Sequence, residues 1–264
     1  MRVLITGGHG FVGSYLTRHL RARDVDVEVS DPTVKNTSID MSRHYQYFRC
    51  PQLAGYQAVI HLAAHSSVAA CEADPQGAVN NNLLDMIHLA RKMKDDQIFI
   101  FASSGSVLDR NTSKLYDATK RAGEQILPYV YPRAHILRFG TVCGVSPVMR
   151  HDLILNGMVR DAVKTGTITV RNPHAWRPVL FLPDLCAAVD RILKGEAPPG
   201  VYDMASFQSR IGGWADMVAQ ITKAQIVDEG PTPHYDFRMN IPPHGMTTPE
   251  EVIGDLVQYW KKRA

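Results

Sequence analysis

The segment Thr6-Gly7-Gly8-His9-Gly10-Phe11-Val12-Gly13 decides the fold that we expect, and it directly follows the apolar run Val3-Leu4-Ile5. The apolar run predicts a short buried strand over residues 2–6, and the residues after the glycines predict a helix over 11–21. A strand that enters a helix through a glycine-rich turn is typical of the first unit of a parallel α/β sheet.

The spacing of the glycines predicts a dinucleotide site. Gly7 allows a tight turn out of the strand, Gly10 lets a pyrophosphate approach the backbone, and Gly13 lets the helix pack closely on the strand. The start of the helix, with Phe11 and Val12, presents free N–H groups and a partial positive charge to the phosphates. We therefore expect these residues to bind the cofactor.

An acidic residue follows the second expected strand. That strand covers residues 25–30 and ends at Asp31, which stands 24 positions after Gly7. A carboxylate at this place accepts hydrogen bonds from the adenosine ribose and repels a 2′-phosphate, which favours NAD over NADP. The structural alternative is a plain glycine turn beside an exposed aspartate.

A second group of residues indicates proton chemistry. The run Gln97–Ala102 predicts a central strand, and Ser104 stands at its carboxyl end, where ligands bind in open α/β sheets. Tyr116 and Lys120 are four apart in an expected helix over 114–129, so they share one face. A lysine ammonium lowers the pKa of a nearby phenol, which can then exchange a proton near neutral pH. Alone, a tyrosine and a lysine four residues apart are usually part of a solvated helix face; the strand end at Ser104 and the glycine motif favour the functional interpretation.

Composition narrows the class of protein. The chain has 264 residues, 45% of them hydrophobic, and a net charge of +3 with scattered basic residues. These values indicate one sizeable core and argue against binding to nucleic acid or a membrane surface. No apolar run is long enough to span a bilayer, and the N-terminus enters a strand at once, so no signal peptide is expected. The four cysteines show no metal or redox spacing, which favours free thiols and a cytoplasmic location.

Strand and helix patterns alternate through the first half, which predicts a Rossmann-type, doubly wound parallel sheet. Residues 1–145 are expected to form the NAD-binding domain, with 171–195 returning to it. Residues 146–264 are expected to form mainly a smaller, discontinuous substrate lobe that includes 201–204. The expected strands are 2–6, 25–30, 45–49, 57–62, 97–102 and 134–139.

These motifs together resemble the extended short-chain dehydrogenase/reductases, in particular the NAD-dependent sugar-nucleotide epimerase/dehydratase group. The resemblance covers most of the chain and rests on several motifs in the family's order. They are Thr6–Gly13, His61-Leu62-Ala63-Ala64, Asp74-Pro75 with Asn82, Ser103-Ser104, the Tyr116/Lys120 pair, Arg138–Gly144, Trp176–Asp184 and Gly200–Asp203.

The resemblance implies roles for individual residues. Ser104, Tyr116 and Lys120 would be catalytic. Lys120 would also hold the nicotinamide ribose, and the cofactor set would further include Leu62, Ala63, Ala64 and Asn82. The substrate side would include His65, Ser66, Asn156, Arg177 and Arg238, the two arginines as clamps on a diphosphate.

For those two arginines the alternative is a surface charge, and for His65 it is a structural role. Asp184 would cap a helix, and Thr248 with Pro249 would open the last helix. Helices over 77–93 and 114–129 would pair in a homodimer as a four-helix bundle, and no metal is expected.

Departures from the family pattern guide the choice of reaction. Gly105 and Ser106 stand where 4,6-dehydratases carry an Asp-Glu pair, so that reaction is disfavoured. The interval from Ser104 to Tyr116 is only 12 residues, and the third strand ends in Arg49-Cys50-Pro51 rather than Gly-Asp. The sequence favours an NAD-dependent, UDP-glucose 4-epimerase-like enzyme. A 4-keto-sugar reductase that uses NAD(P)H and a non-catalytic dinucleotide sensor remain alternatives.

Overall fold

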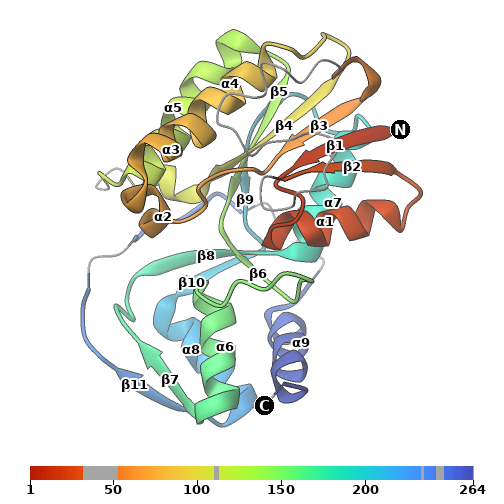
Figure 1. The fold of residues 1–264 in the computed structure, drawn as a ribbon. Helices are drawn as coiled ribbons and strands as arrows, with labels where there is room; N and C mark the ends of the chain where they lie inside the picture. Colours follow the sequence, from red (N-terminus) through yellow and green to blue (C-terminus); the bar gives the residue numbers. More distant parts are fainter. Residues whose placement is uncertain (32–52, 110–112, 233–234, 242–246, 264) are drawn as a thin grey trace. The chain divides into compact units, whose positions relative to one another are not determined.

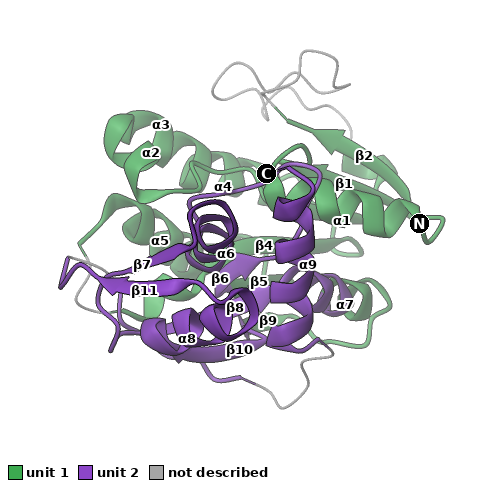
Figure 2. Cartoon of the chain, turned by 90° about the horizontal axis from the view of Figure 1, so that it is seen from below, with its two compact units in different colours: residues 1–138, 189–202 green, residues 139–188, 203–264 purple. Residues whose placement is uncertain are grey.

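The computed structural model describes residues 1–31, 53–109, 113–232, 235–241 and 247–263. The expected strand over 45–49 and the Arg49-Cys50-Pro51 motif lie outside these ranges. The chain divides into two compact units (Figure 2). Unit 1 holds residues 1–138 and 189–202, and unit 2 holds 139–188 and 203–264.

The division differs from the domain boundaries that the sequence suggested. By their internal contacts, residues 171–188 group with unit 2, and the stretch that returns to unit 1 is 189–202 rather than 171–195.

Unit 1 is built on a six-stranded sheet in the order β2-β1-β3-β4-β5-β9 (Figure 1). The pairings of β1 with β2, β1 with β3 and β3 with β4 are parallel, which confirms the expected doubly wound class. The strands are β1 (Arg2–Thr6), β2 (Asp26–Ser30), β3 (Ala58–His61), β4 (Ile98–Ser104), β5 (Ala134–Phe139) and β9 (Gly200–Met204). Residues 201–204 were expected in the smaller lobe; β9 is the edge strand of this sheet, and the boundary between the units falls within it, with 203 and 204 grouped in unit 2.

Helices cover both faces of the sheet, with α1 (Phe11–Arg21) on one face and α4 (Asp85–Ala90) and α5 (Leu115–Val130) on the other (Figure 1). The side chains of Leu4, Val59, Phe99 and Met86 meet in the core beneath α4 and α5. The helix expected over 77–93 is instead α3 (Pro75–Val79), a π-helical turn (Asn80–Leu84) and α4, preceded by α2 (Val68–Ala73). Short 3₁₀ turns cover Leu53–Gly55 and Gly105–Leu108.

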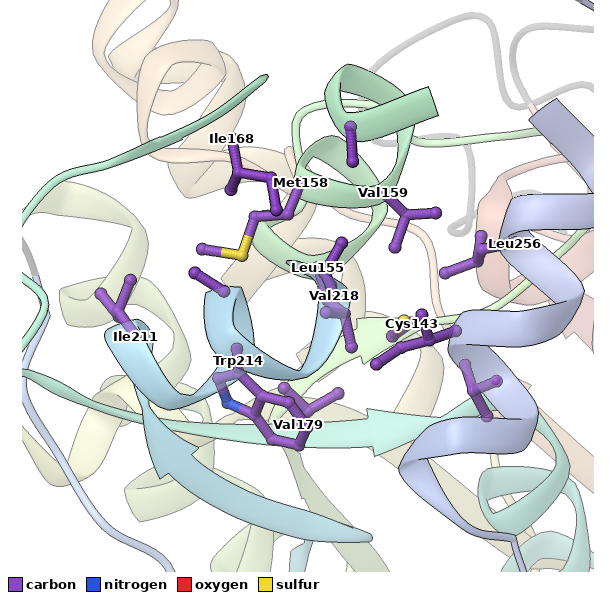
Figure 3. Packing of buried hydrophobic residues seen from close by; sticks show 14 of the residues in the cluster. Cys143, Leu155, Met158, Val159, Ile168, Val179, Ile211, Trp214, Val218 and Leu256 are labelled. Carbon is purple, nitrogen blue, oxygen red and sulfur yellow. The ribbon is translucent and has the colours of Figure 1, made fainter. Parts of the chain in front are cut away.

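The described part of unit 2 combines two small sheets with several helices, of which three lie wholly within the unit. One sheet has the order β10-β8-β6 and the other pairs β11 with β7. The strands are β6 (Thr141–Cys143), β7 (Thr167–Val170), β8 (Trp176–Phe181), β10 (Phe207–Arg210) and β11 (Gln225–Asp228), and the helices are α6 (Ile154–Thr165), α8 (Ile211–Thr222) and α9 (Pro249–Lys261). Leu155, Trp214 and Leu256 bring these helices together in one buried cluster (Figure 3).

Two predictions about helix ends have different outcomes. Thr248 caps α9 with Pro249 at the first position, and Glu251 completes a capping box, so that prediction is confirmed. The cap at Asp184 was wrong, because α7 (Leu182–Leu193) begins two residues earlier. Asp184 lies inside its first turn, where its carboxylate accepts a hydrogen bond from Thr247 at 3.2 Å. Among the described residues, no helix is both long and apolar enough to cross a membrane.

Candidate active site

Two glycines of the turn after β1 occupy positions with no room for a side chain. Gly7 has a φ of +71°, and a Cβ there would lie 2.8 Å from the backbone nitrogen of Ala63. A Cβ on Gly13 would lie 2.2 Å from the carbonyl oxygen of Gly7. Gly10 is the N-cap of α1 and offers no side-chain cap, so the first N–H groups of the helix keep their capacity to bind an anion. This turn fits the pyrophosphate of a dinucleotide.

Asp31 lies at the end of β2 beside this turn. Its side chain is buried, and its carboxylate accepts a hydrogen bond from the backbone N–H of His9 at 3.0 Å. This hydrogen bond therefore fixes the carboxylate that is predicted to bind the ribose beside the glycine turn. Such a carboxylate has further lone pairs with which to accept ribose hydroxyls.

The segment Leu62–Ala64 follows β3 and is held against β1. Thr6 Oγ1 lies 2.8 Å from His61 Nδ1 and accepts a hydrogen bond from the N–H of Ala63 at 3.3 Å. Burial, assisted by the charge of Lys120, lowers the pKa of His61 to about 3. The ring is thus neutral at physiological pH and supports the turn without adding charge.

Asn82 links three segments of unit 1 from a fully buried position. Its Oδ1 accepts the N–H of His65 at 2.7 Å, and its Nδ2 donates to the His65 carbonyl at 3.3 Å and to Thr119 Oγ1 at 3.1 Å. These bonds favour a structural role in which Asn82 joins the loop after β3 to helix α5. Its contact with the cofactor stays a prediction.

His65 and Ser66, the two predicted substrate-binding residues of unit 1, lie in the loop after β3. The ring of His65 lies 2.9 Å from Asn81 Nδ2 through Nδ1 and 3.5 Å from Asp74 Oδ2 through Nε2. These contacts fit the structural alternative for His65. Ser66 is exposed.

Lys120 is a buried cation on helix α5. Its side chain is only 4% exposed, donates from Nζ to the carbonyl of Ala102 at 2.8 Å and lies over the ring of Phe101. Burial lowers the pKa of Lys120 to about 8, while the charges of Cys71 and Glu124 act in the opposite direction. Tyr116 is half-buried one helical turn earlier, on the same face of α5.

A half-buried ion pair follows Lys120 by one more turn. Glu124 receives hydrogen bonds from Arg138 Nε at 3.0 Å and Nη2 at 2.7 Å, and from Ser103 Oγ at 2.5 Å. This network ties the ends of β4 and β5 to α5. Glu124 was not among the residues predicted from the sequence, although its position four residues after Lys120 places it on the same helix face.

Ser104 bonds to a second serine rather than standing alone. Its Oγ lies 2.7 Å from Ser106 Oγ, and Ser106 donates to Asp117 Oδ1 at 2.5 Å. Ser106 and Asp117 are both buried. Neither residue was predicted as a site residue: Ser106 was noted only because dehydratases carry an acid at its position, and Asp117, which stands next to Tyr116, was not named.

The predicted residues of unit 2 have different surroundings. Asn156 is fully buried and uses both ends of its amide, accepting from Gly144 N–H at 3.2 Å and donating to the Arg150 carbonyl at 3.0 Å. These contacts favour a structural role for Asn156. Its contact with substrate stays a prediction.

Arg177 and Arg238 lie in one aromatic cluster. Arg177 donates to the Tyr235 carbonyl at 2.8 Å and lies over the rings of Tyr235 and Phe237. The guanidinium of Arg238 lies 3.8 Å from the ring centre of Trp176. The two arginines predicted to bind a diphosphate are thus positioned by contacts between strand β8 and segment 235–239 of the same unit.

Unit 2 also contains a cavity of about 760 Å³ next to α6. It is lined in part by Arg150, His151, Thr169, Arg171 and Glu229. Arg150 pairs with Asp152, and Arg171 pairs with Glu229, so the basic groups at this cavity are balanced by acids. No group of three or more His, Cys, Asp or Glu side chains that could hold a metal ion occurs among the residues that the structure describes.

The glycine turn, Asp31 and the parallel sheet define an NAD-binding protein of the Rossmann class. More narrowly, the chain matches the model of the NAD dependent epimerase/dehydratase family over residues 3–205 and belongs to that family. Its cofactor is accordingly NAD, as predicted.

Individual relatives are more distant. The chain is 26% identical to UDP-glucuronate 4-epimerase 6 of Arabidopsis thaliana over 280 residues, which cover 88% of this chain but only 58% of that protein. The structure is similar to UDP-glucose 4-epimerase of Thermus thermophilus in complex with NAD (TM-score 0.81, 20% identity, full coverage of both chains). It is also similar to UDP-glucuronic acid 4-epimerase of Bacillus cereus in complex with UDP-glucuronic acid and NAD (TM-score 0.80, 18% identity, full coverage of both chains).

Proposed function

We propose that the chain is an NAD-dependent epimerase of nucleotide-diphosphate sugars that acts through transient oxidation of the sugar to a ketone. The observation that carries the proposal is the buried lysine Lys120, which lies on α5 one turn after Tyr116 and donates a hydrogen bond to the carbonyl of Ala102 in strand β4. The chain's membership of the family supports the same conclusion. The names of the curated relatives support a UDP-sugar as substrate, with UDP-glucuronate the first to test.

In the proposed cycle Tyr116 takes the proton of a sugar hydroxyl as that carbon is oxidised, and returns it when the sugar is reduced. The charge of Lys120 stabilises the phenolate because opposite charges in a poorly solvated site interact strongly. Ser104 contacts the same oxygen from the end of β4. NAD, when bound, supplies the acceptor and later the donor of the hydride.

Gly7, Gly10, Phe11, Val12 and Asp31 would hold the adenosine and pyrophosphate part of NAD. Leu62–Ala64 and Lys120 would line its nicotinamide end. The acid at Asp31 opposes a 2′-phosphate, which argues for a recycled NAD rather than NADPH. On the substrate side, Arg177 and Arg238 would bind the diphosphate through their guanidinium groups.

The test is to incubate the purified protein, without added cofactor, with UDP-glucuronate and with UDP-glucose. We expect the C4 epimer of one of them, together with stoichiometric NAD released on denaturation. A protein that makes no epimer but oxidises NADPH with a keto-sugar is instead a reductase. A protein that binds NAD and turns over neither class is a sensor.

We also propose a homodimer through the outer faces of α4 and α5. Two large apolar side chains of α5 support this, since Tyr129 is 91% exposed and Ile126 is 36% exposed. Sedimentation analysis of Tyr129→Glu is expected to give monomers where the unchanged protein gives dimers. Monomers from the unchanged protein would refute this assembly.

A further inference from the structure

Two arginines of unit 2 lie over the ring of one tryptophan, Trp176. The guanidinium carbon of Arg238 lies 3.8 Å from the ring centre, and that of Arg210 lies 5.8 Å from it. Both distances are within the range of a cation–π contact. Arg210 was not among the residues predicted from the sequence, and the proposed function gives it no role.

The pairing of two strands places Arg210 beside this ring. β10 is antiparallel to β8, and in their register Arg210 lies directly opposite Trp176. Side chains that are directly opposite each other in such a pair lie on the same face of the sheet. The contact between the arginine and the ring therefore follows from the register of the sheet.

Arg238 reaches the same ring from segment 235–239, which is anchored on this sheet. Asp236 accepts a hydrogen bond from the backbone N–H of Trp176 at 2.9 Å, and the N–H of Met239 donates to a glutamine side chain of β10 at 3.1 Å. Met239 is buried, whereas Arg238 is exposed. The backbone on both sides of Arg238 is thus fixed, and its side chain lies at the surface over the ring.

Neither guanidinium has an acidic partner in the part of the chain that the structure describes. Arg210 and Arg238 make no ion pair or hydrogen bond there, whereas Arg150 and Arg171 of the same unit each pair with a carboxylate. An aromatic ring contacts the face of a guanidinium and leaves the N–H groups at its edge available as donors. Two cations at one ring repel each other, and an anion that accepts from both removes this repulsion.

We propose that Arg210 is a further residue that binds the diphosphate of the sugar nucleotide, and that Trp176 is a positioning residue that directs Arg210 and Arg238 toward one phosphate group. This inference rests on the proposed function, in which Arg238 binds the diphosphate. A phosphate group suits two guanidiniums because its several oxygens can accept parallel N–H groups from each of them. A neutral sugar hydroxyl cannot balance two cations.

The first test measures the affinity of the NAD-loaded protein for UDP by calorimetry. In Arg210→Gln we expect the dissociation constant of UDP to rise about tenfold, which corresponds to the loss of one charge-assisted hydrogen bond. In the epimerase assay the KM of the UDP-sugar is expected to rise by a similar factor, with kcat unchanged. Such a split is expected of a residue that binds the diphosphate equally in the ground state and the transition state.

Three further variants separate positioning from a general loss of charge. Trp176→Leu removes the ring from both arginines and is expected to weaken UDP binding by about tenfold or more, whereas Trp176→Phe keeps an aromatic face and is expected to restore the affinity to within about threefold. Arg263→Gln is the matched control, because this exposed guanidinium lies 3.8 Å from the ring centre of Tyr259 in the same unit. It is expected to leave the affinity for UDP unchanged. An unchanged melting temperature reports that each variant is folded.

An affinity for UDP in Arg210→Gln within about twofold of that of the unchanged protein would overturn the inference, whether or not the sugar is epimerised. An unchanged protein that binds no UDP would also overturn it. Normal UDP binding by Trp176→Leu would remove the positioning role of the ring. If UDP binds with the expected loss in Arg210→Gln but no sugar is epimerised, the proposed function fails and the diphosphate site stands.

Discussion

Replacing Lys120 by methionine is expected to stabilise the fold and abolish the activity. Burial lowers the pKa of this lysine from 10.5 to about 8, so at neutral pH the folded state holds a charge that it disfavours. A lowering of the pKa from 10.5 to about 8 corresponds to roughly 3 kcal/mol of unfavourable free energy for the charged form. Methionine loses the hydrogen bond to the Ala102 carbonyl, worth about 1 kcal/mol. The net gain in the free energy of unfolding is about 1–3 kcal/mol near pH 7.

The gain has a definite dependence on pH. Below about pH 8 lysine is charged in both states, and the whole cost of burying the charge falls on the folded protein. Between about pH 8 and 10.5 the unfolded chain binds more protons than the folded one, so the unchanged protein becomes more stable as the pH rises. The stability advantage of Lys120→Met should therefore shrink to about half or less by pH 9.5.

Urea unfolding of the cofactor-free proteins at both pH values measures this difference. Lys94→Met, at an exposed lysine of the same unit, is the control and is expected to change stability by less than about 0.5 kcal/mol. A Lys120→Met protein that is less stable than the unchanged one, with a difference that does not vary with pH, would refute the argument.

Three other substitutions test separate parts of the structure. Glu124→Gln leaves the partly exposed Arg138 without its charged partner and is expected to lower the free energy of unfolding by about 1–2 kcal/mol in urea titrations; an unchanged free energy of unfolding would contradict this role. Gly13→Ala places a Cβ against the carbonyl oxygen of Gly7 and should abolish NAD binding in calorimetry, and retained affinity would show that the turn can shift. Thr248→Ala removes the cap of α9 and is expected to cost about 1 kcal/mol in thermal unfolding, with an unchanged melting temperature as the contrary result.

The parts of the fold that could be predicted are those encoded over short stretches of chain. The strand, glycine turn and helix at the N-terminus follow from local backbone sterics, and Thr248-Pro249 is a local capping signal. Strand β9 has an exposed or half-buried pattern and joins the sheet only through distant pairing, so its sequence does not identify its place. Asp184 was taken for a cap because the sequence does not show that Pro183 is accepted inside the first helical turn.

The residues of the candidate site also differ in whether local sequence could predict them. Tyr116 and Lys120 could be paired because helical geometry brings positions four apart together. The contacts of Ser106 with Asp117 span 11 residues, and those of Asn82 with Thr119 span 37, so they depend on how separate segments pack. Such contacts leave no periodic trace in the sequence.

The most direct test of the central claim is the activity of Tyr116→Phe with its NAD content. The substitution removes one hydroxyl from a half-buried ring. If Tyr116 exchanges the proton of the sugar, epimerisation of the UDP-sugar substrate should fall by at least about 100-fold, the range of a general acid–base contribution, while bound NAD stays stoichiometric. Turnover close to that of the unchanged protein, with NAD still bound, would contradict the account.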